Sequence, residues 1–414
     1  MTTPSLLFIA LLGLVTATRL WLLSRQRAAV LAARSHVPVE FADDVPLEAH
    51  QKAADYTNAK VRIAAVDILI DAALVMLITL GGGLALIDGY LRRHGLDGVT
   101  LGLAVIGAIA AATAFIGWPL SLYQTFVIEA RFGFNRTTWK LYLADRAKGL
   151  LLALVLGVPL MAAILWLMHA AGDAWWLYAW AVWFGFSLTL IWAYPALIAP
   201  WFNRFVPLSN DELKARVEAL IERCGFSSRG VFVMDGSRRS SHGNAYFTGF
   251  GRNKRIVLFD TLIGRLAAEE VEAVLAHELG HYRLHHIRQR LAVSAVTSLA
   301  GLALLGWLTR QPLFYAAFGI ATPSPHTALV LFSIAAPLVT FWITPLAAAW
   351  SRRHEFEADA FATAHVKASA LARALVRLYK DNATSLTPDA VYSSFYDSHP
   401  PARVRIARLR QLKA

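Results

Sequence analysis

Long apolar stretches recur along the chain and are separated by shorter polar segments. A helix needs about 20 apolar residues to cross a hydrocarbon core of ~30 Å. The pattern therefore predicts a mainly α-helical, polytopic membrane protein with about seven transmembrane helices. The expected spans are residues 4–23, 63–91, 101–123, 149–169, 174–199, 291–308 and 328–350.

Two polar segments are long enough to hold soluble structure: the one between the fifth and sixth spans, and the one after the seventh. Apolar residues at helical spacing and short β-branched runs predict helices and a small β-sheet there. Ser209 is a candidate N-cap for the first of these helices. The expected helices are 208–224, 267–287 and 352–366, and the expected strands are 231–233, 244–250 (at the sheet edge) and 256–259.

We expect two regions. Residues 1–203 form an N-terminal transmembrane region with five spans, and residues 204–414 contain the other two spans together with the soluble structure. The second span carries Asp67 and Asp71 near its start. These two carboxylates either face a water-filled interior or lie just outside the bilayer.

Composition agrees with a membrane protein. The 414 residues are 57% hydrophobic and 16% charged, whereas soluble domains average about 45–50% and about 25%. The single cysteine, Cys224, excludes an internal disulfide and a cysteine-based zinc site. Any bound metal must therefore use histidine and carboxylate ligands.

The net charge of +12 is distributed as a membrane topology requires. The loops after the first and third spans carry six and five Lys and Arg residues, whereas the loops after the second, fourth and sixth carry two, none and one. Positive loops stay in the cytoplasm. We therefore expect the N-terminus outside and the catalytic loops and C-terminus in the cytoplasm, with the lipid bilayer and not nucleic acid as the partner of the basic residues.

One segment carries a metal-binding pattern, His-Glu-x-x-His, formed by His277, Glu278 and His281. Residues four apart share a helix face, so both imidazoles can converge on one Zn²⁺, and Glu278 lies beside them, placed to polarise a water molecule. The alternative is a surface helix in which the pattern arose by chance. Leu275 and Leu279 make this helix apolar, which favours buried imidazoles that need partners.

A third ligand is expected, because a catalytic zinc usually takes three from the protein. Residues 351–359 directly follow the seventh span, and on a helix Glu355 and Asp359 share a face while Glu357 points away. We expect Glu355 to bind zinc and Asp359 to accept a hydrogen bond from the outer nitrogen of a ligating histidine. The alternative is a solvated, charged helix.

Two further histidines, His285 and His286, follow the pattern. His281 and His285 are also four apart, but Tyr282, not a carboxylate, follows His281. We interpret His285 and His286 as ordinary polar residues or as residues that support the metal ligands from behind.

Together these motifs resemble the family of membrane zinc metalloproteases that includes the type I CAAX prenyl proteases. The segment HELGH (277–281) pairs with SRRHEFEADAFA (351–362) as it does in that family. Residues 132–135, 240–250, 255–262 and 398–401 resemble further family motifs in the same order. The resemblance runs from the first span to Arg408.

The resemblance implies a fold and a metal site. Seven helices would enclose a large intramembrane chamber, and the zinc site of the 204–414 metalloprotease region would face it. His277, His281 and Glu355 would bind one zinc ion per chain, and Glu278 would be the general base.

The resemblance also implies how substrate binds. The segment from Asn244 to Phe250 would pair with an extended peptide as an added strand. Asn244 is also a candidate for a direct hydrogen bond to the substrate. His399 resembles a family histidine that stabilises the tetrahedral intermediate. Arg405 matches a family arginine near the site, but Val404 stands where the family usually has an acidic residue. The expected substrate-binding residues are Asn244, Ala245, Tyr246, Phe247 and Arg405.

The expected function is zinc-dependent hydrolysis of peptide bonds, removing C-terminal residues from lipidated or membrane-associated peptides. Glu278 would take a proton from water, and the metal and His399 would share the charge of the oxyanion. One alternative is a quality-control metalloprotease of the heat-shock type, and another is a membrane transporter with a chance His-Glu-x-x-His. The sequence does not say whether the substrate is prenylated.

Overall fold

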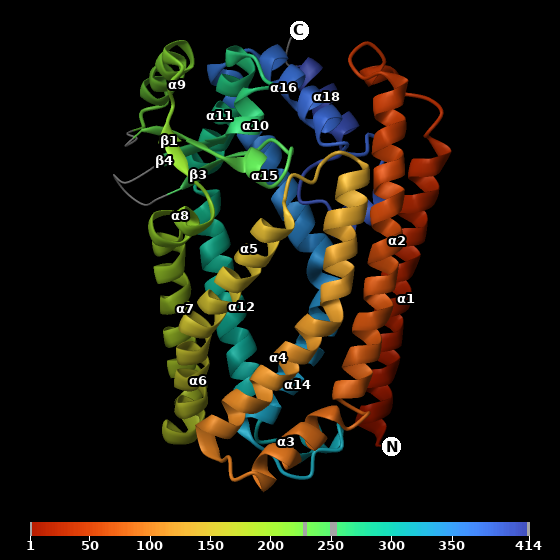
Figure 1. The fold of residues 1–414 in the computed structure, drawn as a ribbon, viewed down its shortest axis with the longest axis vertical. Helices are drawn as coiled ribbons and strands as arrows, with labels where there is room; N and C mark the ends of the chain where they lie inside the picture. The colour runs from red at the N-terminus through yellow and green to blue at the C-terminus, as the bar shows by residue number, and fades with distance from the viewer. Residues whose placement is uncertain (1, 227–229, 249–254, 412–414) are drawn as a thin grey trace.

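The computed structural model describes residues 2–226, 230–248 and 255–411. Long helices form the lower part of the molecule, and a small sheet with shorter helices forms the upper part (Figure 1). Among the described residues, six helices are long and apolar enough to cross a membrane, and a bent pair adds a seventh. The two termini lie at opposite ends of the molecule, as an odd number of spans requires (Figure 1).

The lower part consists mainly of the apolar helices. Turns of π-helix at Gln124–Glu129, Ala153–Gly157 and Tyr194–Ile198 extend α4, α5 and α7. The elements are α1 (Thr3–Ala32), α2 (Leu47–Ile78), α3 (Gly83–Arg93), α4 (Gly98–Tyr123), α5 (Trp139–Leu152), α6 (Val158–Ala170), α7 (Trp175–Ala193), α8 (Ala199–Phe202), α12 (His286–Leu308), α13 (Pro312–Ala316) and α14 (Pro325–Thr340).

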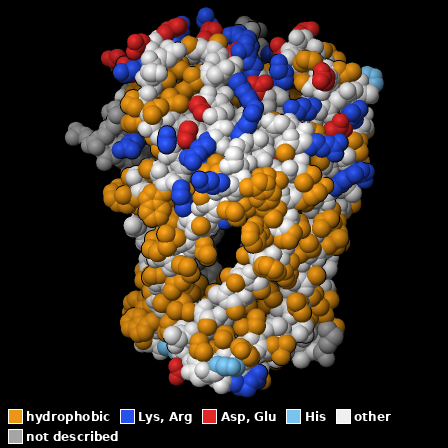
Figure 2. Space-filling model, in the orientation of Figure 1, with side chains coloured by type: hydrophobic (Ala, Val, Ile, Leu, Met, Phe, Trp, Pro, Cys, Tyr) orange, Lys and Arg blue, Asp and Glu red, His pale blue; other side chains and the backbone are white. Residues whose placement is uncertain are grey.

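Surface composition separates the two parts. In Figure 2 hydrophobic side chains cover most of the lower half of the face, while Lys, Arg, Asp and Glu gather over the upper half. The same view shows an opening between the helices at mid-height. The helices therefore surround a hollow interior, as the expected chamber requires.

The second expected span is not one straight helix. A bend of 49° separates α2 from α3, and Gly82 at the bend has φ +79°, a left-handed conformation that glycine adopts without strain. The helix α3 crosses the lower end of the bundle (Figure 1), where Asp88 accepts a 2.6 Å hydrogen bond from His326 of α14. On α2, Asp71 is exposed and lies 3.5 Å from Arg19 of α1, so this carboxylate has a basic partner on the neighbouring helix.

The upper part contains a four-stranded sheet with strand order β1-β2-β4-β3. The strands β2 and β4 are parallel, and the outer strands run antiparallel to them. The sequence predicted β2, β3 and β4 but not β1. The elements are β1 (Phe205–Pro207), α9 (Asp211–Arg223), β2 (Val231–Met234), β3 (Ala245–Thr248), β4 (Arg255–Phe259), α10 (Asp260–Ile263), α11 (Ala268–Arg283), α15 (Thr344–His365), α16 (Ala368–Asp381), α17 (Ala390–Tyr396) and α18 (Ala402–Gln411).

Three expected helix boundaries need correction. Asn210, not Ser209, caps α9, because its side chain accepts a 2.9 Å hydrogen bond from the backbone of Leu213. The expected helix 267–287 is divided at His285, whose φ of +61° ends α11 and lets α12 begin one residue later. The expected helix 352–366 is the upper part of α15, which begins at Thr344 and continues the last span upward.

The helices α11 and α15 approach each other closely at Gly280. A Cβ at Gly280 would lie 3.0 Å from the backbone of Ala358 and 3.2 Å from the Cβ of Phe361. Any side chain there would push the two helices apart. The glycine inside the His-Glu-x-x-His pattern thus sets the distance between the two helices that carry it and Glu355.

Replacing Gly280 with valine tests this constraint. Overpacking of this kind costs about 1–3 kcal/mol, so we expect Gly280→Val to lower the thermal unfolding midpoint in detergent and to reduce zinc content. Gly301→Val is the matched control, because a Cβ at this helical glycine meets nothing within 4 Å. Equal stability and zinc content in the two variants would contradict the constraint.

Candidate active site

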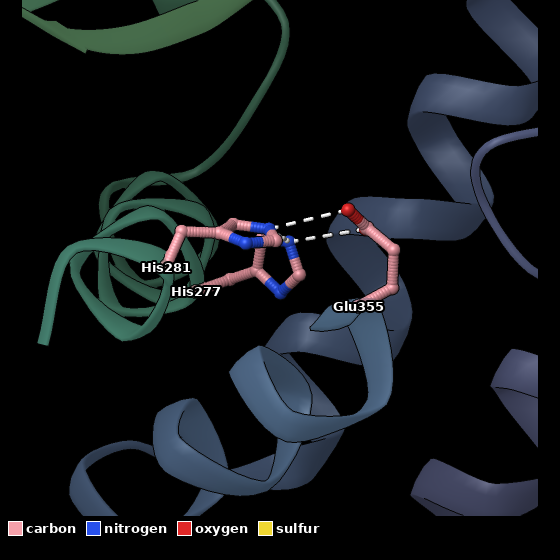
Figure 3. Close-up of side chains that lie close together, drawn as sticks. All are labelled: His277, His281 and Glu355. Carbon is pink, nitrogen blue, oxygen red and sulfur yellow. Dashed lines mark hydrogen bonds and ion pairs between the residues drawn. The ribbon is translucent and has the colours of Figure 1, made fainter. Parts of the chain in front are cut away.

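Three side chains, two of them buried and that of His281 partly exposed, meet between α11 and α15 (Figure 3). His277 and His281 project from successive turns of α11, and Glu355 faces them from α15. The two Nε2 atoms are 3.2 Å apart. Glu355 Oε2 lies 3.4 Å from His277 Nε2, and Glu355 Oε1 lies 3.2 Å from His281 Nε2.

These separations fit a metal ion. Zinc bonds of about 2.0–2.2 Å in tetrahedral geometry place the ligand atoms roughly 3.3 Å from one another. Glu355 Oε2 is also buried without a hydrogen-bond partner among the described residues, and the guanidinium of Arg405 comes no closer to it than 3.5 Å; a buried carboxylate oxygen in this state is costly unless a cation binds it. Two imidazole nitrogens and one carboxylate are a donor set typical of catalytic zinc.

The outer nitrogen of His277 is held in place. Its Nδ1 lies 2.9 Å from Asp359 Oδ1, so Asp359 lies where the sequence predicted a supporting carboxylate. Arg405, which is 4% exposed, donates bonds of 2.7 and 2.6 Å to the two oxygens of Asp359. Burial opposes the charge of Arg405, but its bonds to Asp359 outweigh that effect and raise the pKa of the guanidinium.

Arg405 differs from expectation in its contacts. The sequence predicted a substrate-binding residue, and the side chain does border the cavity described below. Its side chain, however, donates hydrogen bonds to Asp359 and lies against the ring of His277, with Arg405 Nη2 3.0 Å from His277 Nδ1. In this arrangement Arg405 holds Asp359 and the ring of His277 in place.

Glu278 lies beside the ligands and borders the same cavity. Burial raises the pKa of its carboxyl group, because desolvation disfavours the charged form, and His277 and His281 oppose that shift only in part. A carboxylate with a raised pKa is a stronger base than usual, and one at this position can accept a proton from a water molecule at the site.

His399 enters from the segment between α17 and α18. Its Nε2 lies 3.5 Å from Glu355 Oε2, and its Nδ1 lies 3.0 Å from the hydroxyl of Ser398. The side chain is 64% exposed and faces the cavity. The surrounding walls desolvate the ring and lower the pKa of His399, so at neutral pH it is an uncharged hydrogen-bond donor.

A cavity of about 800 Å³ connects these groups with the sheet edge. Pockets of this size suit a small ligand or a short peptide segment. Its walls include residues from α2, β3, α11, α16 and the C-terminal segment, among them Lys60, Asn244, Ala245, Glu278, Tyr396 and His399.

The strand β3 lies at the edge of the sheet beside this cavity. The backbone of Phe259 donates to the carbonyl of Asn244, and the register pairs Ala245 with Leu258. Pairs alternate in an antiparallel ladder, so the N–H and C=O of Ala245 point away from β4. The Ala245 N–H is met instead by the side chain of Asn244 at 2.8 Å.

The other expected substrate residues are only partly defined. Tyr246 is half-buried and pairs with Val257 of β4. Phe247 pairs with Ile256 through its backbone, but its side chain and residues 249–250 of the expected strand lie outside the described residues.

Behind His281 lies a second polar cluster; sequence reasoning considered a supporting role for His286 but missed the other two members. It consists of His286, His354 and Glu357, which also lie close enough together to hold a metal ion. His354 stands directly before Glu355 in the same motif, and this adjacency is a signal that could have identified it. The partners of His354 lie on α12, about 65 positions away, and local spacing does not show them.

Two histidines and a glutamate that could hold a metal ion, placed where membrane helices meet a soluble domain and beside a peptide-sized cavity, are the arrangement expected of a membrane metalloprotease. Comparison with known proteins gives the family. The model described as CAAX prenyl protease N-terminal, five membrane helices, matches residues 26–204, and the model of peptidase family M48 matches residues 207–413. The chain belongs to the CAAX prenyl protease family within peptidase family M48.

Curated relatives are similar in sequence to most of this chain. A CAAX prenyl protease 1 homolog of Arabidopsis thaliana is 38% identical, covering 84% of this chain and 82% of the relative. CAAX prenyl protease 1 of Saccharomyces cerevisiae is 35% identical, covering 77% and 74%, and the Homo sapiens homolog is 32% identical, covering 95% and 92%.

A crystal structure of S. mikatae Ste24p matches with a TM-score of 0.91 and 30% identity, covering 99% of both chains. The predicted family and fold are therefore confirmed, and the chain is a multi-pass membrane endopeptidase that depends on a metal. The comparisons lend no support to the heat-shock-type protease or the transporter.

Proposed function

We propose that this protein binds one Zn²⁺ through His277, His281 and Glu355 and uses it to hydrolyse peptide bonds near the C-terminus of lipidated, membrane-associated substrates. The observation that carries the proposal is the convergence of two imidazole nitrogens, 3.2 Å apart, on one carboxylate whose two oxygens lie 3.4 and 3.2 Å from them, close to the ligand-atom separation of a tetrahedral zinc site. The names of the relatives support the choice of substrate, because they are CAAX prenyl proteases.

Each residue then has a separate role. Bound zinc supplies Lewis acidity to the scissile carbonyl and to water. Glu278 accepts the proton of the attacking water and later donates it to the leaving amine. His399 donates a hydrogen bond to the oxygen that gains charge. Asp359, fixed by Arg405, holds His277 in the tautomer that leaves Nε2 free for the metal.

The substrate is held by the sheet edge. An extended peptide that pairs with β3 would bond to the outward N–H and C=O of Ala245 and displace the side chain of Asn244 from that N–H. Asn244 would then be free to bond to the peptide itself. Pairing of this kind uses the peptide backbone, so it tolerates different side chains and leaves specificity to the lipid and the C-terminal residues.

The division between regions at residue 203 and the membrane orientation stay predictions. Basic loops favour a cytoplasmic catalytic domain. In intact cells, with Cys224 replaced by serine, a cysteine at Thr3 should react with a membrane-impermeant thiol reagent, and a cysteine at the exposed Ala407 should not. The reverse labelling pattern would invert the orientation.

Glu278→Gln separates catalysis from metal binding. The change keeps the shape of the side chain and removes the base, so cleavage of a prenylated CaaX peptide should fall about 10²–10⁴-fold while zinc stays equimolar. Metal analysis and product detection on purified protein in detergent measure both quantities. Glu218→Gln, on the exposed face of α9, is the control and should match the wild type.

The outcomes separate the parts of this proposal. Wild-type protein that is folded but contains no zinc would refute the metal site. Zinc in both proteins, with full cleavage by Glu278→Gln, would remove Glu278 from the mechanism. Zinc without cleavage of this peptide by the wild type would keep the site and refute the lipidated CaaX substrate.

Two proline substitutions test the strand-pairing mode. Ala245→Pro removes an N–H that the sheet does not use, so the fold should persist while kcat/KM falls roughly 2–10-fold, the worth of one hydrogen bond. Tyr246→Pro removes an N–H that faces β4 and should lower the unfolding midpoint. If Ala245→Pro leaves kcat/KM unchanged, the peptide does not pair at this position.

A further inference from the structure

Behind His281 lies a cluster of polar side chains that the proposed chemistry does not use. His286 is the first residue of α12 and is 1% exposed, and His354 of α15 is 2% exposed. Glu357, one turn after His354, has a side chain that is 37% exposed. Buried polar groups in such a cluster are held by hydrogen bonds or metals, and their partners show which applies here.

The cluster continues a chain of hydrogen bonds that starts at His281. His281 Nδ1 lies 2.9 Å from His286 Nδ1. The other ring nitrogen of His286, Nε2, lies 3.1 Å from Glu357 Oε2. Glu357 is fixed in turn by Arg353, which donates a 2.8 Å bond to Oε1.

Proton positions along this chain are determined once His281 binds a metal through Nε2. The proton of a neutral imidazole must then be on Nδ1 of His281, which becomes a donor. His286 Nδ1 must accept that bond, so the His286 proton is on Nε2, where it is donated to Glu357. With this assignment, each protonated ring nitrogen along these hydrogen bonds faces an acceptor: His281 Nδ1 faces His286 Nδ1, and His286 Nε2 faces Glu357.

The surrounding structure fixes the His286 ring in the orientation that this chain needs. The left-handed conformation of His285, with φ +61°, separates α11 from α12, and His286 at the start of α12 lies against His281. The ring of His354 stacks on His286 with centroids 3.9 Å apart and planes 6° apart. His354 is held by Gln289, 3.1 Å from its Nε2.

We propose that His286 is a positioning residue for the metal site: it accepts the Nδ1 proton of His281, is anchored by Glu357, and thereby fixes the ring and tautomer of this ligand. Asp359 has the corresponding role for His277, because its carboxylate accepts the Nδ1 proton of that ring. The proposal rests on the ligand role of His281 proposed above. Partners of this kind typically contribute 10–100-fold to metal affinity.

A second metal ion is the competing explanation, because His286, His354 and Glu357 could form a site themselves. His354 Nδ1 is buried without a hydrogen-bond partner among the described residues, which favours that explanation. Proton positions argue against it. A metal on His286 Nε2 would move the proton to Nδ1, where it would face the proton of metal-bound His281 at a nitrogen separation of 2.9 Å.

The matched variants are His286→Asn and His286→Leu, which have nearly the same shape. Asparagine can place its oxygen where Nδ1 lies, whereas leucine offers no acceptor. We expect His286→Leu to raise the Kd for zinc about 10–100-fold and His286→Asn to stay within about fivefold of the wild type. Competition with a chelator of known affinity measures the Kd, and thermal unfolding of the metal-free proteins checks the fold.

Glu357 provides a second pair if His286→Leu does not fold. Glu357→Gln keeps an acceptor for His286 and should leave the Kd for zinc nearly unchanged, whereas Glu357→Met, of similar shape, should raise it several-fold. Equal affinities in the asparagine and leucine variants, or in the glutamine and methionine variants, would refute the proposal. Absence of zinc from the wild type would instead refute the metal site itself.

His354→Phe distinguishes the two explanations of the cluster. Phenylalanine keeps the ring stacked on His286 and removes both nitrogens. We expect one zinc per chain in the wild type and in His354→Phe, with similar Kd values. Two zinc ions in the wild type and one in His354→Phe would establish a second metal site and overturn the proposal.

Discussion

The contact between α11 and α15 is the constraint on which the active site depends. Each helix carries part of the proposed metal-binding set, and neither part is complete alone. Gly280 lets the helix backbones approach until the ligand atoms of His277, His281 and Glu355 lie 3.2–3.4 Å apart. A largely buried cluster of this kind carries a large desolvation cost without a metal, so the packing that brings the helices together would also create the proposed affinity for a cation.

The continuity of α15 connects this contact to the membrane. The helix begins at Thr344 within the last apolar span and continues it upward, and it carries Glu355 and Asp359 on the face that meets α11. From the other side, the break at His285 separates the helix of the first two ligands from the span α12. One ligand is therefore borne by a helix that rises from the bilayer, and the other two by a helix that packs within the soluble core.

Local spacing explains what the sequence could predict. The positions of His277 and His281 follow from one helical turn, and those of Glu355 and Asp359 from another, so both pairs and their shared faces were predictable. Contacts between distant segments were not. The bond from Arg405 to Asp359 and the stacking of His354 on His286 join residues about 46 and 68 positions apart. The bends at Gly82 and His285 depend on single left-handed residues inside runs that otherwise read as helix or span.

The strand β3 has a consequence for which proteins can be cut. An unpaired sheet edge in water recruits other strands and promotes aggregation. Here the edge borders a cavity of about 800 Å³, and the side chain of Asn244 covers the outward N–H of Ala245. A folded domain cannot enter such a space, whereas a flexible tail can. Under the proposed strand pairing, the protease would therefore select substrates by conformation before it reads their sequence, and folded neighbours in the membrane would be spared.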